Sequence, residues 1–332
     1  MKPTTVPLPG GHTLEIGSRS GHRSPEVYGP SGRSEWLDID WREHQRWVSV
    51  NGQPVNTIDL GEDRSETGQP IVFVHGLTGS WSNWLEQLPV FAGRPQSDGS
   101  PLARHRVVAM DLPGFGHSPM PREQITISFY ARLLDGLLDQ LGIDAAAVVG
   151  NSMGGFISAE LAIAFPQRVE RLVLVSPAGI STYRDRREAM VPMLRRFEPA
   201  LTALTAWGAN RADAITSRPA LRQAVLGDLV RYPGRLPATI AAELVRGAGK
   251  PGFMQALAAN FDYDFRDRLH EIVCPTLIVW GDHDRIVTVR DAAVYAELIP
   301  GSRKVIFNDT GHLAMVERPD AFNALLAEFL EE

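Results

Sequence analysis

The strongest chemical signal in the sequence is the motif Gly150-Asn151-Ser152-Met153-Gly154. It follows the apolar run 145–149 and precedes a segment with a helical spacing of apolar residues. A serine on a sharp turn between a strand and a helix needs small residues two positions before and after it, and the two glycines supply them. The start of the helix would also direct free N–H groups at negative charge that forms beside the serine. The motif therefore predicts that Ser152 is a nucleophile.

A serine nucleophile needs a base, and the base needs an acid that orients it. His312 follows the apolar run 305–307, and both Asp282 and Asp284 follow the run 276–280. Because the carboxyl ends of parallel strands open onto one crevice, His312 and one of these two carboxylates can meet Ser152 there. Asp309 is also close to His312 in sequence, but we expect a carboxylate three residues away to bond within its own turn.

Alternating strands and helices must position these residues. A hairpin is predicted over 47–60, because Asn51-Gly52 separates two β-rich runs and both turn residues tolerate a positive φ. Helical spacing marks 127–141 and 319–330. Continuous apolar runs, typical of strands buried on both faces, lie at 71–74, 107–110, 145–149, 172–175, 276–280 and 305–307. The pattern predicts an α/β fold with a mostly parallel central sheet flanked by helices.

One long segment breaks this alternation. Residues 178–270 contain Ala-, Leu- and Arg-rich helical stretches and no convincing strand, and strand signals return at 276. We interpret 178–270 as a helical cap that is inserted into a core of 36–177 and 271–332. Residues 1–35 hold six Gly, five Pro and five Ser, so they can bury little apolar surface and are expected to form a flexible N-terminal extension.

The composition excludes several classes of protein. The 332 residues include 33 Lys and Arg against 39 Asp and Glu, a net charge of −6, which argues against an electrostatic nucleic-acid binder. No apolar run approaches the roughly 18 residues of a membrane span. The single cysteine, Cys274, has no partner for an internal disulfide and cannot form a multi-cysteine metal site. We expect a cytoplasmic protein that acts on a small molecule, and the oligomeric state stays open.

The order Ser152, Asp, His312 resembles that of the α/β-hydrolase family, and the resemblance runs from about Trp47 to the C-terminus. Two further motifs are similar to those of the family: His75-Gly76-Leu77 and the loop 111–118, which reads Asp-Leu-Pro-Gly-Phe-Gly-His-Ser. The resemblance implies that the backbone N–H groups of Leu77 and Met153 form an oxyanion hole. Its W-G-x-x-D pattern places the acid at Asp284 and leaves Asp282 to stabilise the turn. It also implies that no cofactor and no metal ion are needed.

Three functions fit this family. We favour a serine hydrolase that cleaves a carboxylic ester of a small organic substrate through an acyl-enzyme. The first alternative is a carbon–carbon bond hydrolase of ring-fission products, which are vinylogous diketones, because the string 150–155 resembles that group. The second alternative is a non-catalytic receptor for a small molecule on the same fold. The arginine clusters at 184–187 and 195–196 are interpreted as solvated helix faces, with binding of a substrate carboxylate as the alternative.

Overall fold

The structure is a computed structural model of the chain. It describes residues 27–61, 68–93, 105–181, 200, 203–247 and 249–332, together with three short strands nearer the N-terminus. The arginine clusters at 184–187 and 195–196 lie outside the described residues, as does most of the segment 1–26.

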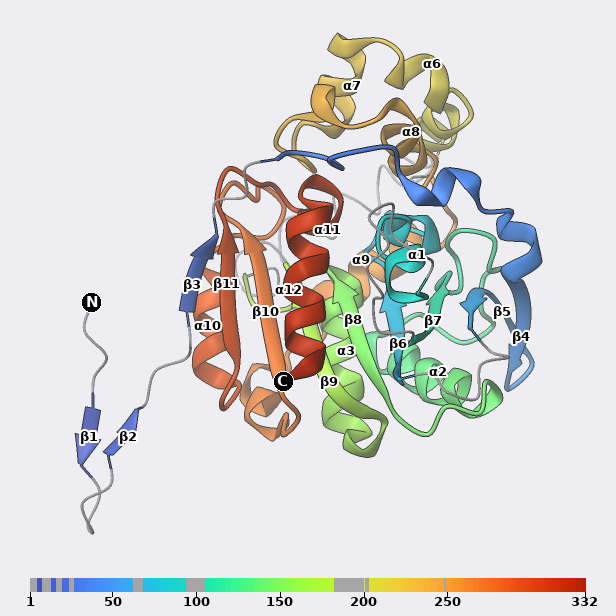
Figure 1. Ribbon diagram of the computed structural model, residues 1–332. Helices are drawn as coiled ribbons and strands as arrows, with labels where there is room; N and C mark the ends of the chain where they lie inside the picture. Colours follow the sequence, from blue (N-terminus) through green and yellow to red (C-terminus); the bar gives the residue numbers. More distant parts are fainter. Residues whose placement is uncertain are drawn as a thin grey trace.

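A nine-stranded sheet forms the centre of the molecule (Figure 1). The spatial order is β3-β11-β10-β9-β8-β6-β7-β5-β4, and every neighbouring pair from β3 to β7 is parallel. Strands β5 and β4 continue it as an antiparallel hairpin, whose turn residues Asn51 and Gly52 both have positive φ as the sequence predicts. The bounds are β3 (Ser20–Arg23), β4 (Gln45–Val50), β5 (Gln53–Leu60), β6 (Gly68–Val74), β7 (His105–Met110), β8 (Ala146–Asn151), β9 (Val169–Val175), β10 (Thr276–Gly281) and β11 (Arg303–Phe307).

Helices cover both faces of this sheet. Successive strand residues point to opposite sides, so Val72 of β6 joins one apolar core while Phe73 joins the other. This arrangement explains the continuous apolar runs and confirms the predicted α/β fold. The first core packs α2 (Ile127–Gln140), α3 (Met153–Ala164) and α10 (Asp291–Leu298), and the second packs α1 (Leu88–Phe91), α11 (Ala314–Glu317) and α12 (Pro319–Glu331). Short 3₁₀ turns are η3 (Trp81–Trp84), which follows β6, and η4 (Pro166–Arg168), which precedes β9.

A helical region separates β9 from β10, and the described part of 178–270 contains no strand. Figure 1 shows α6, α7 and α8 grouped together at the top of the view, above the sheet. Residues 203–209 are also helical. The bounds are α6 (Ala212–Thr216), α7 (Pro219–Leu226), η5 (Pro233–Arg235), α8 (Ala238–Arg246), α9 (Phe253–Asp262) and η6 (Arg266–Glu271). We keep the name cap for residues 178–270, whose limits remain a prediction.

The described residues of the predicted N-terminal extension include three short strands. Strands β1 (Thr5–Pro7) and β2 (Thr13–Glu15) pair with each other, and β3 pairs in parallel with β11 at the sheet edge. After β3 the chain lies against the body through η1 (Glu35–Asp38) and η2 (Trp41–His44), and the Ser34 hydroxyl and Trp36 indole both donate to Glu86. Every helix in the described ranges is too short or too polar to cross a bilayer.

Candidate active site

Ser152 lies on the turn between β8 and α3 in a strained backbone conformation. Its φ of 56° and ψ of −120° fall outside the regions that non-glycine residues commonly adopt, at a cost of about 1–3 kcal/mol. The surrounding backbone holds this turn, since Ser152 donates to the Val175 carbonyl at 2.9 Å and its own carbonyl accepts from Phe156 and Ala178. Its side chain makes no capping bond to the helix, so the hydroxyl is free to face the cavity described below.

Glycines on three sides allow the turn to form. A Cβ atom on Gly150 would lie 2.4 Å from the Gly154 carbonyl oxygen, and one on Gly154 would lie 2.2 Å from that of Val74. Gly76 lies against the serine itself, because a Cβ there would be 3.1 Å from the Ser152 Cβ. The strand, the helix and the loop after β6 therefore approach the serine more closely than any larger residue would permit.

His312 and Asp284 form the most direct polar contact of the site. The His312 Nδ1 and Asp284 Oδ2 atoms are 2.7 Å apart, and both side chains are almost fully buried. The other carboxylate oxygen of Asp284 accepts the backbone N–H groups of Ile286 and Val287 at 2.8 and 2.9 Å. With Asp284 held in this way, the imidazole carries its proton on Nδ1 and presents Nε2 as the acceptor.

The other two aspartates near His312 have different partners. Asp282 accepts from the backbone N–H of Thr310 at 3.2 Å and contacts the His283 ring at 2.7 Å, a contact within its own turn. The expectation that Asp309 bonds within its own turn is wrong for its side chain. It accepts from Tyr232 and Arg231 of the cap at 2.8 and 3.2 Å, because the cap brings these donors to the exposed end of the loop.

The loop after β6 is the expected source of one oxyanion donor. Leu77 follows Gly76 on this loop, and Met153 is the first residue of α3, so no earlier helical carbonyl can accept its N–H. His75 stabilises the loop: its Nδ1 lies 2.7 Å from the Gly76 oxygen, and its Nε2 accepts the Leu112 N–H at 3.0 Å. Burial lowers the pKa of His75, so the ring is neutral and can donate and accept at the same time.

Asp111 braces the same loop from the neighbouring strand end. Its buried carboxylate accepts from Asn56 and from the backbone N–H groups of Trp81 and His117, each at 2.8 or 2.9 Å. Burial acts to raise its pKa, but the hydrogen bonds from His117 and from the Trp81 backbone help to outweigh burial and lower it. Gly116 must be a glycine here, because a Cβ would lie 2.0 Å from the carboxyl carbon. The 111–118 motif thus has a structural function.

Ser152 and His312 both line one cavity of about 200 Å³. Two of its lining residues, Leu229 and Leu244, belong to the cap, so the cavity lies between the cap and the carboxyl ends of the strands. The remainder of the lining is apolar or uncharged: Gly76, Leu77, Thr78, Gly79, Asn83, Asn151, Ile286 and Leu313. No group of three or more possible metal ligands occurs in the described ranges.

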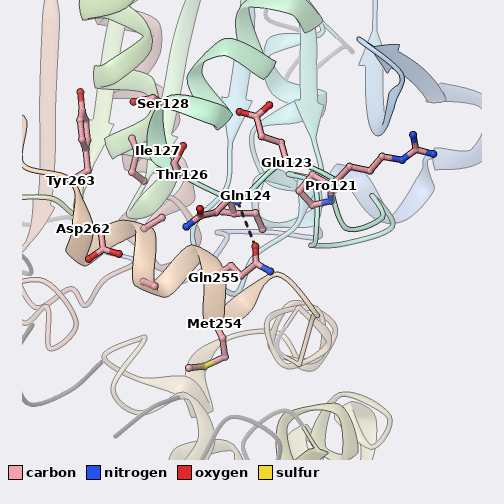
Figure 2. A pocket seen from close by; sticks show the side chains of 14 residues that line it. Pro121, Glu123, Gln124, Thr126, Ile127, Ser128, Met254, Gln255, Asp262 and Tyr263 are labelled. Atoms are coloured by element: carbon pink, nitrogen blue, oxygen red, sulfur yellow. Dashed lines mark hydrogen bonds between the residues drawn. The ribbon is translucent and has the colours of Figure 1, made fainter. Parts of the chain in front are cut away.

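A larger cavity of about 670 Å³ lies elsewhere, between the 121–128 segment and α9 (Figure 2). The Ile125 N–H and Gln255 Oε1 are 3.5 Å apart across it, and Glu123 and Asp262 lie at its walls. Its described lining contains no histidine or cysteine. Because this described lining offers no histidine to act as a base for its one serine, Ser128, we place the candidate site in the smaller cavity.

Glu317, which no sequence motif singled out, is a carboxylate that is fully buried beside the His312 loop. It accepts the N–H groups of Gly311 and Leu313 at 2.9 and 3.2 Å. The one feature of the sequence that could have drawn attention to Glu317 is its position directly after the apolar stretch 313–316. Such a residue is rarely buried without several donors.

Comparisons with known proteins agree with this architecture. Residues 69–319 match the family model described as alpha/beta hydrolase fold. A 2-hydroxy-6-oxo-2,4-heptadienoate hydrolase of Pseudomonas putida is 31% identical over 86% of this chain and 95% of its own length. A 2-hydroxymuconate semialdehyde hydrolase of a Pseudomonas species is 30% identical over 81% of this chain and 89% of its own length. The structure of an enol-lactonase from Burkholderia xenovorans superposes with a TM-score of 0.67 and 27% identity, over 86% of this chain and all of that one.

Proposed function

The chain belongs to the α/β-hydrolase fold family and is a hydrolase of that fold, and from this premise we propose that it hydrolyses a carbon–carbon bond in a vinylogous diketone acid. The observation that carries the mechanism is the contact of 2.7 Å between Asp284 and His312, with His312 and Ser152 in one cavity. The choice of substrate is supported by relatives at 30–31% identity that are named for 2-hydroxy-6-oxo-dienoates and 2-hydroxymuconate semialdehyde. Ester cleavage, which the sequence analysis placed first, becomes the second candidate.

In the proposed reaction the Ser152 hydroxyl attacks the ketone carbon at position 6 of the substrate. His312 Nε2 accepts the hydroxyl proton, and Asp284 stabilises the resulting imidazolium. The negative charge moves to the ketone oxygen, where the N–H groups of Leu77 and Met153 are proposed to bind it. Each such donor is worth about 10²–10³ in rate, because it is already oriented toward the developing charge.

Collapse of the tetrahedral intermediate breaks the bond between positions 5 and 6. The substrate reacts as its 2,6-dioxo tautomer, in which the proton of the 2-hydroxyl has moved to the carbon at position 5 and one double bond remains between positions 3 and 4. The departing carbon at position 5 takes the electron pair as a dienolate, whose charge is delocalised onto the 2-oxo oxygen, and His312 returns its proton to that oxygen. The products of this step are a 2-hydroxydienoate and acyl-Ser152. A water molecule then loses a proton to His312, attacks the acyl carbon and releases the carboxylic acid with regeneration of the serine.

The described lining of the cavity supports the ester or lactone candidate. Apart from His312 it carries no group that can be cationic, whereas a dienoate carboxylate in such a site needs a cation or several donors. An enol-lactonase is also among the structures that resemble this chain at 27% identity. The arginine clusters at 184–187 and 195–196 could provide that cation in the first candidate, although they lie outside the described residues.

The test compares kcat/KM for 2-hydroxy-6-oxo-2,4-heptadienoate with kcat/KM for 4-nitrophenyl butyrate, and uses Ser152→Ala as the control. We expect a preference of at least about 100-fold for the dienoate, and a loss of at least about 10³-fold for both substrates in Ser152→Ala. A preference for the ester would favour the second candidate. Tight binding without turnover of either substrate would favour a receptor and contradict both.

A further inference from the structure

Three consecutive backbone N–H groups hold the loop that carries His312. The Gly311 and Leu313 groups donate to the two carboxylate oxygens of Glu317, and the His312 group donates to the Leu229 carbonyl of the cap at 3.0 Å. The loop is therefore anchored on both sides of the imidazole-bearing residue. One anchor is a single carboxylate and the other is the cap backbone.

The space around this anchor is small. A Cβ atom on Gly311 would lie 2.9 Å from the Arg231 backbone nitrogen and 3.0 Å from a carboxylate oxygen of Glu317. Arg231 also donates its own backbone N–H to Glu317 at 2.8 Å. The carboxylate thus joins the His312 loop to the cap, and a small displacement of Glu317 would be transmitted to both.

The fourth donor to Glu317 comes from the N-terminal segment. The Tyr28 hydroxyl donates to the carboxylate at 2.9 Å and accepts the backbone N–H of Tyr232 at 2.8 Å. Its ring lies edge-on to the Tyr232 ring at 5.4 Å and beneath the Arg318 guanidinium at 4.8 Å. The Gly29 N–H adds a bond to the Glu317 carbonyl at 2.7 Å. Tyr28 therefore connects the N-terminal segment directly to the cap and, through Glu317, to the His312 loop.

We propose that Glu317 is a positioning residue for His312, and that Tyr28, which precedes the predicted core, completes this unit by holding Glu317 against the cap. The inference rests on the proposed function, because it assigns His312 as the base of that reaction. Neither residue lines the cavity, so we place both outside the groups that contact substrate. Their effect is on the orientation of the imidazole, and so on the rate of the chemical step.

Protonation states agree with this arrangement. Burial, and then the neighbouring Glu317 charge, raise the pKa of Tyr28 well above its usual range, so the hydroxyl keeps the proton that it donates. Burial raises the pKa of Glu317, while the N–H groups of Arg231 and Gly311 and the Tyr28 hydroxyl act to lower it. These donors are the compensation that a buried carboxylate requires.

Two variants test whether Glu317 and Tyr28 position His312, and each variant has a matched control. Glu317→Gln keeps the size of the side chain but replaces one acceptor oxygen by an NH₂ group, so at least one loop N–H loses its acceptor. Its control is Glu86→Gln, because Glu86 is a half-buried carboxylate that also accepts from the N-terminal segment, through Ser34, but its described side-chain donors do not belong to the His312 loop. Tyr28→Phe removes only the hydroxyl. Its control is Tyr263→Phe, which removes a hydroxyl that donates to a different buried carboxylate, Glu160, at 2.8 Å.

We expect kcat to fall at least about tenfold in Glu317→Gln and about threefold to tenfold in Tyr28→Phe, with KM changed less than about threefold. The rate at which a fluorophosphonate probe labels Ser152 should fall in parallel, and both controls should stay within about twofold of the parent chain. The substrate is whichever of the dienoate and the ester the parent chain turns over faster. Melting temperatures of all four variants establish that the folded fraction is not the cause.

The possible failures can be told apart. A kcat and a labelling rate for Glu317→Gln equal to those of Glu86→Gln would overturn the positioning role of Glu317. If Glu317→Gln does not fold, Tyr28→Phe decides, and equality with Tyr263→Phe would overturn the proposal. Retained turnover in Ser152→Ala would instead contradict the proposed function, and the labelling rates would still decide the role of Glu317.

Discussion

The replacement Asp284→Asn tests the central contact of the proposed site. Asn has the same shape as Asp, but one of its two terminal atoms is a donor. The Ile286 and Val287 N–H groups both point at Oδ1, so the amide oxygen must stay on that side to accept them. The amide nitrogen then faces His312 Nδ1 at the position where Oδ2 now lies 2.7 Å away. The variant therefore forces the imidazole to carry its proton on Nε2, where it cannot accept a proton from Ser152.

The size of the effect follows from the charge that is lost. Asp284 is fully buried, and His312 gains a positive charge when it accepts the serine proton. Two unit charges about 4 Å apart at an effective dielectric constant of about 20 interact by about 4 kcal/mol. This energy corresponds to about 10³ in rate, and the wrong tautomer adds to it. We expect kcat to fall by about 10³–10⁴, with the melting temperature changed by only a few degrees because both backbone bonds are kept.

The assay is kcat for the better substrate of the parent chain, with Asp282→Asn as the matched control. Asp282 lies on the same turn and is partly exposed, and it contacts His283 and the Thr310 N–H rather than His312. We expect this control to lose less than about threefold. A kcat for Asp284→Asn within tenfold of the parent chain would refute the assignment of Asp284 as the orienting acid. A large loss in Asp282→Asn alone would transfer that function to Asp282.

Two further predictions concern residues that support the site, namely Gly154 beside the Ser152 turn and His75 in the loop after β6. Gly154→Ala should lower the free energy of unfolding by at least about 3 kcal/mol in urea titrations, because its Cβ would lie 2.2 Å from the Val74 carbonyl oxygen. The control Gly208→Ala should leave the free energy of unfolding unchanged, since the nearest atom to its Cβ would be 3.9 Å away. Equal free energies of unfolding for the two variants would disprove the close approach at Gly154. Burial lowers the pKa of His75 in the folded state, so the unfolded chain binds more protons there and stability is lost as the pH falls below the ordinary value of 6.5. His75→Gln should therefore reduce the slope of unfolding free energy against pH below 6.5, by up to about 1.4 kcal/mol per pH unit, and an unchanged slope would contradict a neutral buried His75.

Much of the core architecture was predictable because its signals are local. Strand runs such as 71–74 are apolar on both faces, which predicts a strand buried on both sides. The Asn51-Gly52 turn needs two positive φ angles, and these two residue types tolerate them, so the pair predicts the hairpin. The glycines around Ser152 are of the same kind, since the need for a small residue follows from the turn alone. The Asp284–His312 contact also follows from topology, because β10 and β11 are parallel neighbours and their carboxyl ends must lie together.

The cap and the N-terminal segment were less predictable because their contacts are made at long range. Asp309 was expected to bond locally, but the cap places Tyr232 and Arg231 within reach of its carboxylate. The contacts of β3 and Ser34 with the body likewise depend on partners that the Gly- and Pro-rich composition of this segment does not reveal, namely β11 and Glu86.

The hydrogen bond between Tyr28 and Glu317 joins residues 289 positions apart, so no local pattern reports it. The burial of Glu317 is likewise not evident from the local pattern, because a glutamate beside an apolar stretch is ordinarily exposed. Once the fold buries it, the carboxylate requires several donors. The His312 loop supplies two N–H groups and the cap supplies one, which leaves acceptor capacity for a further donor. Glu317 can therefore link three parts of the chain because no one of them supplies all of its donors.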